Sequence, residues 1–448
     1  MRDALVTIFL FGWVPLILIR PWTGALAWAV ISYFNPHRLT WGFAYHVPWG
    51  MVLGIPTLLA WLFSKEKKTF PLTTVSVILI VYTVWVCITT LFALEPDLAV
   101  EKWSKAMKII GMTFLTMAVI NSRDRLNWLI WIICASFGFY ALRGGLFALM
   151  SGGAHRVYGP LDSFIEDNNA LALACIMVLP LFRYLQLQAT KAWMRWGLAG
   201  FMFLMLLSIL ASYSRGAFVA LIVMSFMFWL RSRRRFLLGV IGLLALGGAF
   251  SYMPAAYFDR LSTIKSYEED QSADNRFEAW TFAYKVATAR PLTGGGFSAF
   301  ISVANYNRYY PIKAGARNAH SIWFEALGEH GFVGLFLFLG LMGSAIVGCS
   351  SIMKKTRNHP ELAWAHDLCA MVQVGVISYG VGGAFLNLAT FDLYYHLVAT
   401  VVITSAIVKT TLAQSSAAVA PAGAAPAGAE GPKTPPPIGP SGLPQPAR

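Results

Sequence analysis

Long apolar segments alternate with short polar segments along most of the chain. About twenty consecutive apolar residues are enough for a helix to cross the hydrocarbon core of a bilayer. The pattern therefore predicts an all-α polytopic membrane protein with about twelve transmembrane helices. The predicted spans are a first stretch at 5–34, followed by 49–63, 72–94, 103–120, 126–150, 170–187, 193–212, 217–230, 236–252, 332–352, 365–385 and 393–412.

The first apolar stretch, 5–34, is interrupted at Arg20-Pro21 and is compatible with two arrangements. One bent span gives a cytoplasmic N-terminus and twelve spans in all, whereas a hairpin of two spans gives thirteen and an external N-terminus. Basic clusters in every second loop mark the cytoplasmic side by the positive-inside rule, and we expect twelve spans. These clusters lie at 65–68, 123–125, 191–195, 231–235 and 354–357.

A polar segment of roughly eighty residues, 253–331, interrupts the apolar pattern. Long loops are often functional, and the many aromatic residues of this one argue against disorder. We expect a large folded loop on the outer side of the membrane that carries active-site residues. The chain then divides into N-terminal transmembrane helices at 1–252, the loop at 253–331, C-terminal transmembrane helices at 332–412 and a disordered cytoplasmic tail at 413–448.

Composition supports the membrane prediction. The chain is 57% hydrophobic and 12% charged, against about 25% charged residues in a soluble domain. The apolar runs are too long for the alternating segments of an outer-membrane barrel. All five cysteines fall in such runs, which predicts packed thiols and no disulfide framework. The sequence has no motif typical of a metal or nucleotide site, so we expect no metal, no cofactor and no nucleic-acid partner.

The formal net charge of +14 includes many arginines on the predicted outer side, where basic residues are normally depleted. For any single arginine, scattered surface charge is the alternative interpretation. Together they suggest an anionic ligand, because guanidinium groups match phosphate oxygens. The candidates for substrate binding are Arg143, Arg156 and Arg290.

Arg215 stands in Ser212-Tyr-Ser-Arg-Gly216, where two predicted spans meet almost without a loop. An arginine at the membrane boundary either extends to the headgroups or lines a polar cavity. Gly216 would leave the backbone open to a ligand, and Tyr213 is a further candidate for substrate binding. Arg276 lies in a stretch of the polar segment with a helical pattern.

Other polar residues admit both a structural and a functional interpretation. His320 precedes an apolar helix near the outer surface, where a lone histidine is usually structural. The run from Gly294 to Gly296 predicts a tight turn whose amides approach a ligand. Asp167 or Asn168 is more simply a helix cap. One further group either lines the same cavity or forms an interfacial belt: Asp392, Tyr394, Tyr395 and His396.

Several of these residues form an ordered set of short motifs. The set comprises Ser212/Ser214/Arg215/Gly216, Arg276 with Trp280, Pro291/Gly294/Gly296, and His320 followed by Glu325 or Glu329, Gly331 and Gly334. It resembles the O-antigen ligase and polymerase family of bacterial inner-membrane glycosyltransferases, over roughly residues 168–341. This chain has Ser321 where many relatives have asparagine. The stretches at 34–37 and 159–169 are similar to the branch of O-glycosylation ligases associated with exosortase systems.

The resemblance implies a GT-C-like enzyme in the bacterial inner membrane with its active site facing the periplasm. It implies a donor glycan on undecaprenyl diphosphate, lipid A-core as the acceptor and membrane lipids as further partners. The glycan would be transferred to a sugar hydroxyl of the acceptor, with inversion at the anomeric carbon and without a metal. In that setting Arg215 and Arg276 would hold the diphosphate. His320 would be the general base or would hydrogen-bond the diphosphate.

Three other functions are compatible with these residues. An O-antigen polymerase or a protein O-oligosaccharyltransferase would use the same fold with another acceptor. A transporter of an anionic lipid-linked substrate is of another class, and such proteins often contain internal repeats and interrupted helices at mid-membrane. The sequence has no evident repeat, and its polar residues gather at the predicted outer face, which makes a transporter the weaker alternative.

Overall fold

The computed structural model describes residues 1–231, 268–311 and 315–419. These residues form helices and no strand, which confirms the all-α prediction. The chain divides into two compact units, 1–408 and 409–448, and all site residues discussed below lie in the first. The predicted span at 236–252 and the first part of the predicted loop lie outside the described residues, as does the tail beyond residue 419.

Eight helices of the described part are long and apolar enough to cross a membrane. They are Arg2–Ile19, which joins α1 and α2, α6 (Thr74–Leu91), α8 (Arg123–Met150), α9 (Asn168–Gln188), α10 (Ala192–Leu210), α16 (Ile322–Thr356), Pro360–Phe385, which includes α17 (Ala363–Gly382), and Asp392–Ser415 in α18 (Asp392–Val419). The predicted spans at 49–63, 103–120 and 217–230 fall in α5 (Trp49–Phe63), α7 (Pro96–Val119) and α11 (Arg215–Arg231). The polytopic membrane fold is therefore confirmed, and the count of twelve stays a prediction.

The first apolar stretch is a hairpin. Its arms are α1 (Arg2–Phe11) with α2 (Trp13–Ile19), and α3 (Thr23–Ala29) with the π-helical η1 (Val30–Phe34). Pro21 has no amide hydrogen with which to continue the first arm, and α2 packs on α3 after the turn. The N-terminus returns to the segment that follows η1, since the carboxylate of Asp3 accepts a hydrogen bond of 3.1 Å from the Ala44 amide. The stretch is therefore not the single bent span that we expected, whereas the total of twelve or thirteen spans stays a prediction.

Local sequence sets where the helices near the site begin. The hydroxyl of Thr73 accepts the Ser76 amide at the start of α6. Asp167 accepts the Ala170 amide at 3.2 Å and caps α9, which confirms its structural interpretation. Each such contact satisfies an amide that has no partner inside the helix.

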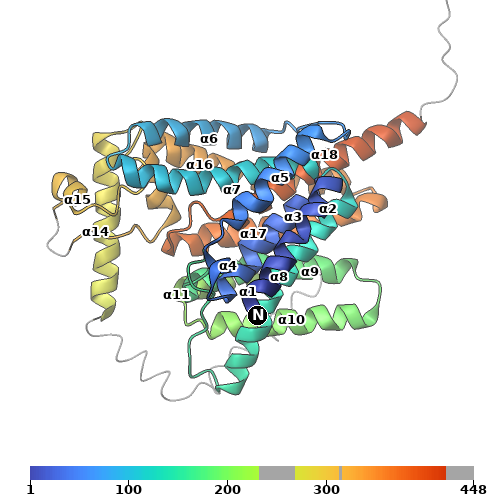
Figure 1. The fold of residues 1–448 in the computed structure, drawn as a ribbon, viewed down its shortest axis with the longest axis horizontal. Coiled ribbons are helices and arrows are strands. Elements are labelled where there is room, and N and C mark those ends of the chain that lie inside the picture. The colour runs from blue at the N-terminus through green and yellow to red at the C-terminus, as the bar shows by residue number, and fades with distance from the viewer. Residues whose placement is uncertain (232–267, 312–314, 420–448) are drawn as a thin grey trace, which may run out of the picture. The chain divides into compact units, whose positions relative to one another are not determined.

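The described part of the polar segment is folded. Figure 1 shows α14 (Glu268–Ala289) running roughly perpendicular to α6, α7 and α16, next to their ends. Phe282 on α14 stacks on Tyr306 of α15 (Val303–Tyr309) with ring centroids 3.9 Å apart, and Phe300 packs against both. The aromatic residues that argued against disorder thus form a small core of their own.

Helix α16 changes direction at Gly331, whose φ of 69° and ψ of −171° are not helical. The turn from Pro291 to Gly296 packs into this kink. Phe332 donates its amide to the Pro291 carbonyl at 3.0 Å, and Gly296 donates to the Glu329 carbonyl at 2.8 Å. The predicted loop boundary at residue 331 coincides with the kink, but residues 322–330 are already helical.

Candidate active site

Hydrogen bonds fix the backbone at His320 and at the residue before it. It stands immediately before Ser321, the N-cap of α16, with a left-handed φ of 45°. Its amide donates to the side-chain oxygen of Asn387 at 2.6 Å. The preceding carbonyl, of Ala319, accepts a hydrogen bond of 2.9 Å from the indole nitrogen of Trp280. These two contacts fix the main chain from which the imidazole projects.

Arg276 lies on α14, one helical turn before Trp280 and therefore on the same face. Burial lowers the pKa of its guanidinium, and the positive charge of Arg215 lowers it further. Arginine nevertheless stays protonated at physiological pH. The two cations, from α11 and α14, thus lie close enough to repel each other.

The same charges act on His320. Burial lowers the pKa of its imidazole and the charge of Arg276 lowers it further, while the carboxylates of Asp167 and Glu325 act in the opposite direction. The imidazole is therefore neutral at pH 7. Arg276 therefore interacts electrostatically with both Arg215 and His320, the other two residues predicted to be catalytic.

The motif around Arg215 is fixed by hydrogen bonds within the protein. The Ser214 hydroxyl accepts the Ala217 amide at 3.1 Å at the first turn of α11. The Asn168 side chain donates to the Ser212 carbonyl at 2.6 Å, which joins the start of α9 to this motif. We had expected the backbone at Gly216 to be open to a ligand. A Cβ on Gly216 would instead lie 3.0 Å from Phe385, so a side chain covers the backbone there.

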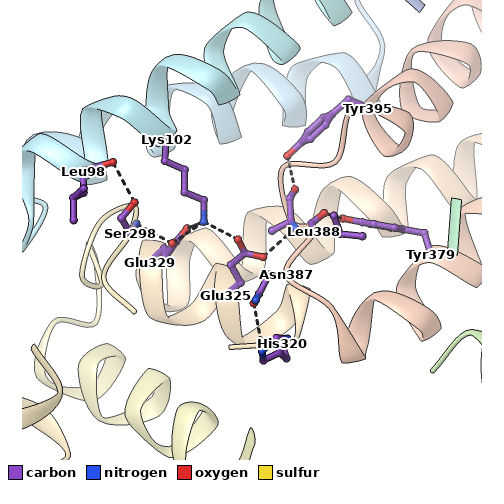
Figure 2. Close-up of polar contacts among 11 residues, drawn as sticks. Leu98, Lys102, Ser298, His320, Glu325, Glu329, Tyr379, Asn387, Leu388 and Tyr395 are labelled. Atoms are coloured by element: carbon purple, nitrogen blue, oxygen red, sulfur yellow. Dashed lines mark hydrogen bonds and ion pairs between the residues drawn. The ribbon is translucent and has the colours of Figure 1, made fainter. Parts of the chain in front are cut away.

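A buried ion cluster lies beside His320 (Figure 2). The ammonium group of Lys102, on α7, is 2.7 Å from Glu325 Oε1 and 2.8 Å from Glu329 Oε1. The Ser298 amide donates to Glu329 at 2.9 Å, and the Ala389 amide donates to Glu325 at 3.1 Å. Every charge of the cluster thus has a partner, which is the condition for keeping charges in a protein interior.

The cluster forms one wall of a cavity of about 200 Å³. The cavity is also lined by Asn387, whose side chain holds the His320 amide, and by Ala319. Glu325 additionally fixes the segment that carries Asn387, through the Ala389 amide. The carboxylates therefore position the backbone around His320.

Lys102 and Asn387 were not among the predicted site residues. Lys102 lies at the edge of a predicted span, and Glu325 and Glu329 share one helix face because they are four residues apart. That carboxylate pair was the available signal for a buried cation nearby. Nothing in the sequence of Asn387 distinguishes it, because its role depends on where the chain returns between α17 and α18.

Other predicted site residues serve structural roles or lie elsewhere. Arg290 donates to the Phe92 carbonyl, just past the end of α6. Tyr213 donates its hydroxyl to the Gly153 carbonyl. Arg156 is exposed in the segment after α8. Arg143 lines a separate cavity near the N-terminus, which shares no lining residue with the cavity beside His320.

We had expected the amides of the glycine turn, Gly294 to Gly296, to approach a ligand, but they donate to carbonyl groups of the protein. The Gly294 amide donates to the Arg290 carbonyl at 2.9 Å and the Gly296 amide to the Glu329 carbonyl at 2.8 Å. A Cβ on Gly296 would lie 2.4 Å from the Cβ of Ala93. With φ of 60° and 75°, these two glycines allow the turn to pack closely against α16 and the end of α6.

Four predicted residues at the start of α18 form neither an interfacial belt nor part of the cavity beside His320: Asp392, Tyr394, Tyr395 and His396. All four side chains are buried. His396 and Asp392 lie 2.8 Å apart, and Asp392 accepts the indole N–H of Trp28 at 3.0 Å. Tyr395 donates to the Ala389 carbonyl at 3.0 Å and so supports the segment next to Glu325.

Potential metal ligands do not gather in the described part of the chain: no group of three or more His, Cys, Asp or Glu side chains there could hold an ion. All five cysteines are free.

Comparison with known proteins gives two family matches. Residues 200–339 match the family model described as O-Antigen ligase, and residues 1–190 match a family of unknown function. No curated protein matches the chain. The first match contains Arg215, Arg276 and His320, and it supports the O-antigen ligase and polymerase family.

Proposed function

We propose that this protein is an O-antigen ligase. It would transfer a glycan from undecaprenyl diphosphate to a sugar hydroxyl of lipid A-core at the periplasmic face of the bacterial inner membrane. The observation that carries the proposal is the electrostatic interaction of Arg276 with both Arg215 and His320, within the segment that matches the O-antigen ligase family. The multi-pass helical fold supports a lipid-linked substrate.

The two arginines are suited to a diphosphate. The charge of Arg215 acts unfavourably on that of Arg276, and an anion between them would relieve that repulsion. During transfer the bond between the anomeric carbon and the diphosphate oxygen breaks, and the diphosphate leaves with the electron pair. Preorganised guanidinium groups stabilise the charge that develops on it.

His320 is suited to act as the base. Its imidazole is neutral at pH 7 because burial and Arg276 lower its pKa. It would take the proton of the acceptor hydroxyl while the acceptor oxygen forms the new bond to the anomeric carbon, with inversion. An imidazolium formed there would be stabilised by the carboxylates of Asp167 and Glu325, which favour the protonated form.

Glu325 and Glu329 act as positioning residues in this mechanism. Lys102 forms an ion pair with each of them, and their remaining contacts hold the Ser298 and Ala389 amides. They would thereby keep the cavity open beside His320.

The test is reconstitution of the full chain with a lipid-diphosphate-linked glycan. Wild type should form product without ATP, and Arg215→Ala, Arg276→Ala and His320→Ala should each lose about 100-fold or more in rate. Arg308→Ala is the matched control, because Arg308 is an exposed arginine of the same polar segment that stacks on Tyr309. Equal loss in all four variants would refute the assignment.

The acceptor is tested in the same system. Lipid A-core, an acceptor protein and a second lipid-linked repeat unit are supplied separately. Product with lipid A-core alone supports the ligase, whereas product only with the protein or only with the repeat unit identifies an O-oligosaccharyltransferase or a polymerase. Movement of the donor across the membrane without product would identify a transporter.

A further inference from the structure

A second cavity, of about 780 Å³, lies in the N-terminal part of the chain and has no role in the proposed transfer. We call it the arginine cavity, because Arg2, Arg38 and Arg143 line it. It is open, and the rest of its lining is apolar, including Phe9, Phe34 and Phe139. All of these residues fall within the segment matched by the family of unknown function.

Two of the arginines are held in place by aromatic rings. The guanidinium of Arg2 lies 4.5 Å from the ring centroid of Trp41, and that of Arg38 lies 4.6 Å from the ring centroid of Tyr45. Such stacking covers one face of a guanidinium and leaves the N–H groups at its edge available. The arginines are therefore positioned for hydrogen bonding to a ligand.

The cavity carries an excess of positive charge. Arg38 lies 3.7 Å from the carboxylate of Asp162, which is 64% exposed. The nearby Asp3 accepts the Ala44 amide. Within the described residues no hydrogen bond or ion pair engages Arg143. Among the described residues, Arg38 alone of the three guanidinium groups forms an ion pair, so Arg143 is available to an anion.

The depth of the cavity matches a lipid headgroup. Arg143 follows Arg123 by twenty residues on α8, which is a rise of about 30 Å and close to the thickness of the hydrocarbon core. The two arginines thus mark the two headgroup levels of the bilayer. The exposed rings of Phe9 and Phe139 then lie where the acyl chains begin.

We propose that the arginine cavity binds a phosphate-bearing lipid. The phosphate would accept hydrogen bonds from Arg143 with Arg2 and Arg38, and the apolar chain would lie against Phe9 and Phe139. The site is independent of the transfer reaction, since none of its residues belongs to the site around His320.

The test is native mass spectrometry of the purified full chain titrated with phosphatidylglycerol. Arg143→Gln should weaken the tightest binding event about tenfold, the loss expected for one charge-assisted hydrogen bond. Arg156→Gln is the matched control, because Arg156 is also exposed and follows the same helix but lies outside the cavity. Equal weakening in both variants would show nonspecific attraction to surface charge and overturn the proposal.

A second arm separates the lipid from free phosphate. Phe139→Ala should weaken phosphatidylglycerol binding, and millimolar inorganic phosphate should not displace the lipid. Displacement by phosphate together with unchanged binding by Phe139→Ala would overturn the lipid assignment. Arg143→Lys keeps the charge and should bind better than Arg143→Gln, and a reversed order would also contradict the proposal.

Discussion

Removal of the Lys102 ammonium group tests how the cavity beside His320 is held together. In Lys102→Met the carboxylates of Glu325 and Glu329, whose side chains are 6% and 4% exposed, lose their shared cation. Removing one partner of a buried ion pair typically costs about 3–5 kcal/mol. Because Lys102 itself is 27% exposed, we expect the lower end, about 3 kcal/mol in the free energy of unfolding.

The triple variant Lys102→Met, Glu325→Gln, Glu329→Gln should recover most of that stability. Glutamine keeps a side-chain oxygen that accepts the Ser298 and Ala389 amides, and no charge is left unpaired. The assay is thermal unfolding of the purified full chain, with the transfer rate measured in parallel.

Lys105→Met is the matched control on the same helix. Lys105 forms an ion pair of 2.8 Å with Glu101, but both side chains are about two-thirds exposed: 64% and 66%. Its loss should leave the unfolding temperature almost unchanged, because exposed pairs contribute little. Equal destabilisation by Lys102→Met and Lys105→Met would refute the reasoning, as would a triple variant no more stable than Lys102→Met.

Three further predictions concern the site and its support. Transfer should be lost as the pH falls through the pKa of His320, which lies below the ordinary value, because only the neutral imidazole accepts a proton. In the pH profile of the residual activity of Arg276→Gln, this loss at acidic pH should occur at a higher pH, because the charge that lowers the pKa is gone. An unchanged pH profile would contradict the charge interaction. Gly296→Ala should destabilise the protein by about 2–4 kcal/mol through overpacking and left-handed strain, whereas Gly315→Ala, with open space around its Cβ, should cost about 1 kcal/mol; chemical denaturation of both variants measures the difference, and equal costs would rule out the packing argument. Trp280→Phe should lower the transfer rate about tenfold with a small change in stability. Phenylalanine keeps the aromatic stack on Phe324 but loses the hydrogen bond to the Ala319 carbonyl, which fixes the His320 segment. A wild-type rate would show that this bond is dispensable.

The sequence alone determined the fold class and much of the candidate site. Apolar segments of membrane length specify helices, since only helices satisfy every backbone polar group within one segment. The aromatic content of the polar segment indicated a folded unit, and α14 with its core is that unit. The arginines and the histidine were also visible, because charged residues at a membrane boundary are costly and few.

Only the tertiary structure decided which of those residues meet. Arg215 and Arg276 lie far apart along the chain, yet in the fold the charge of Arg215, on α11, acts on the guanidinium of Arg276, on α14. Arg143 has the same chemistry and lies in another cavity. The glycine turn and Gly216 resembled ligand-binding backbone, yet protein atoms cover both. A sequence motif fixes which conformations a backbone can adopt, but the atoms that fill the adjacent space come from distant segments and are known only once the chain is folded.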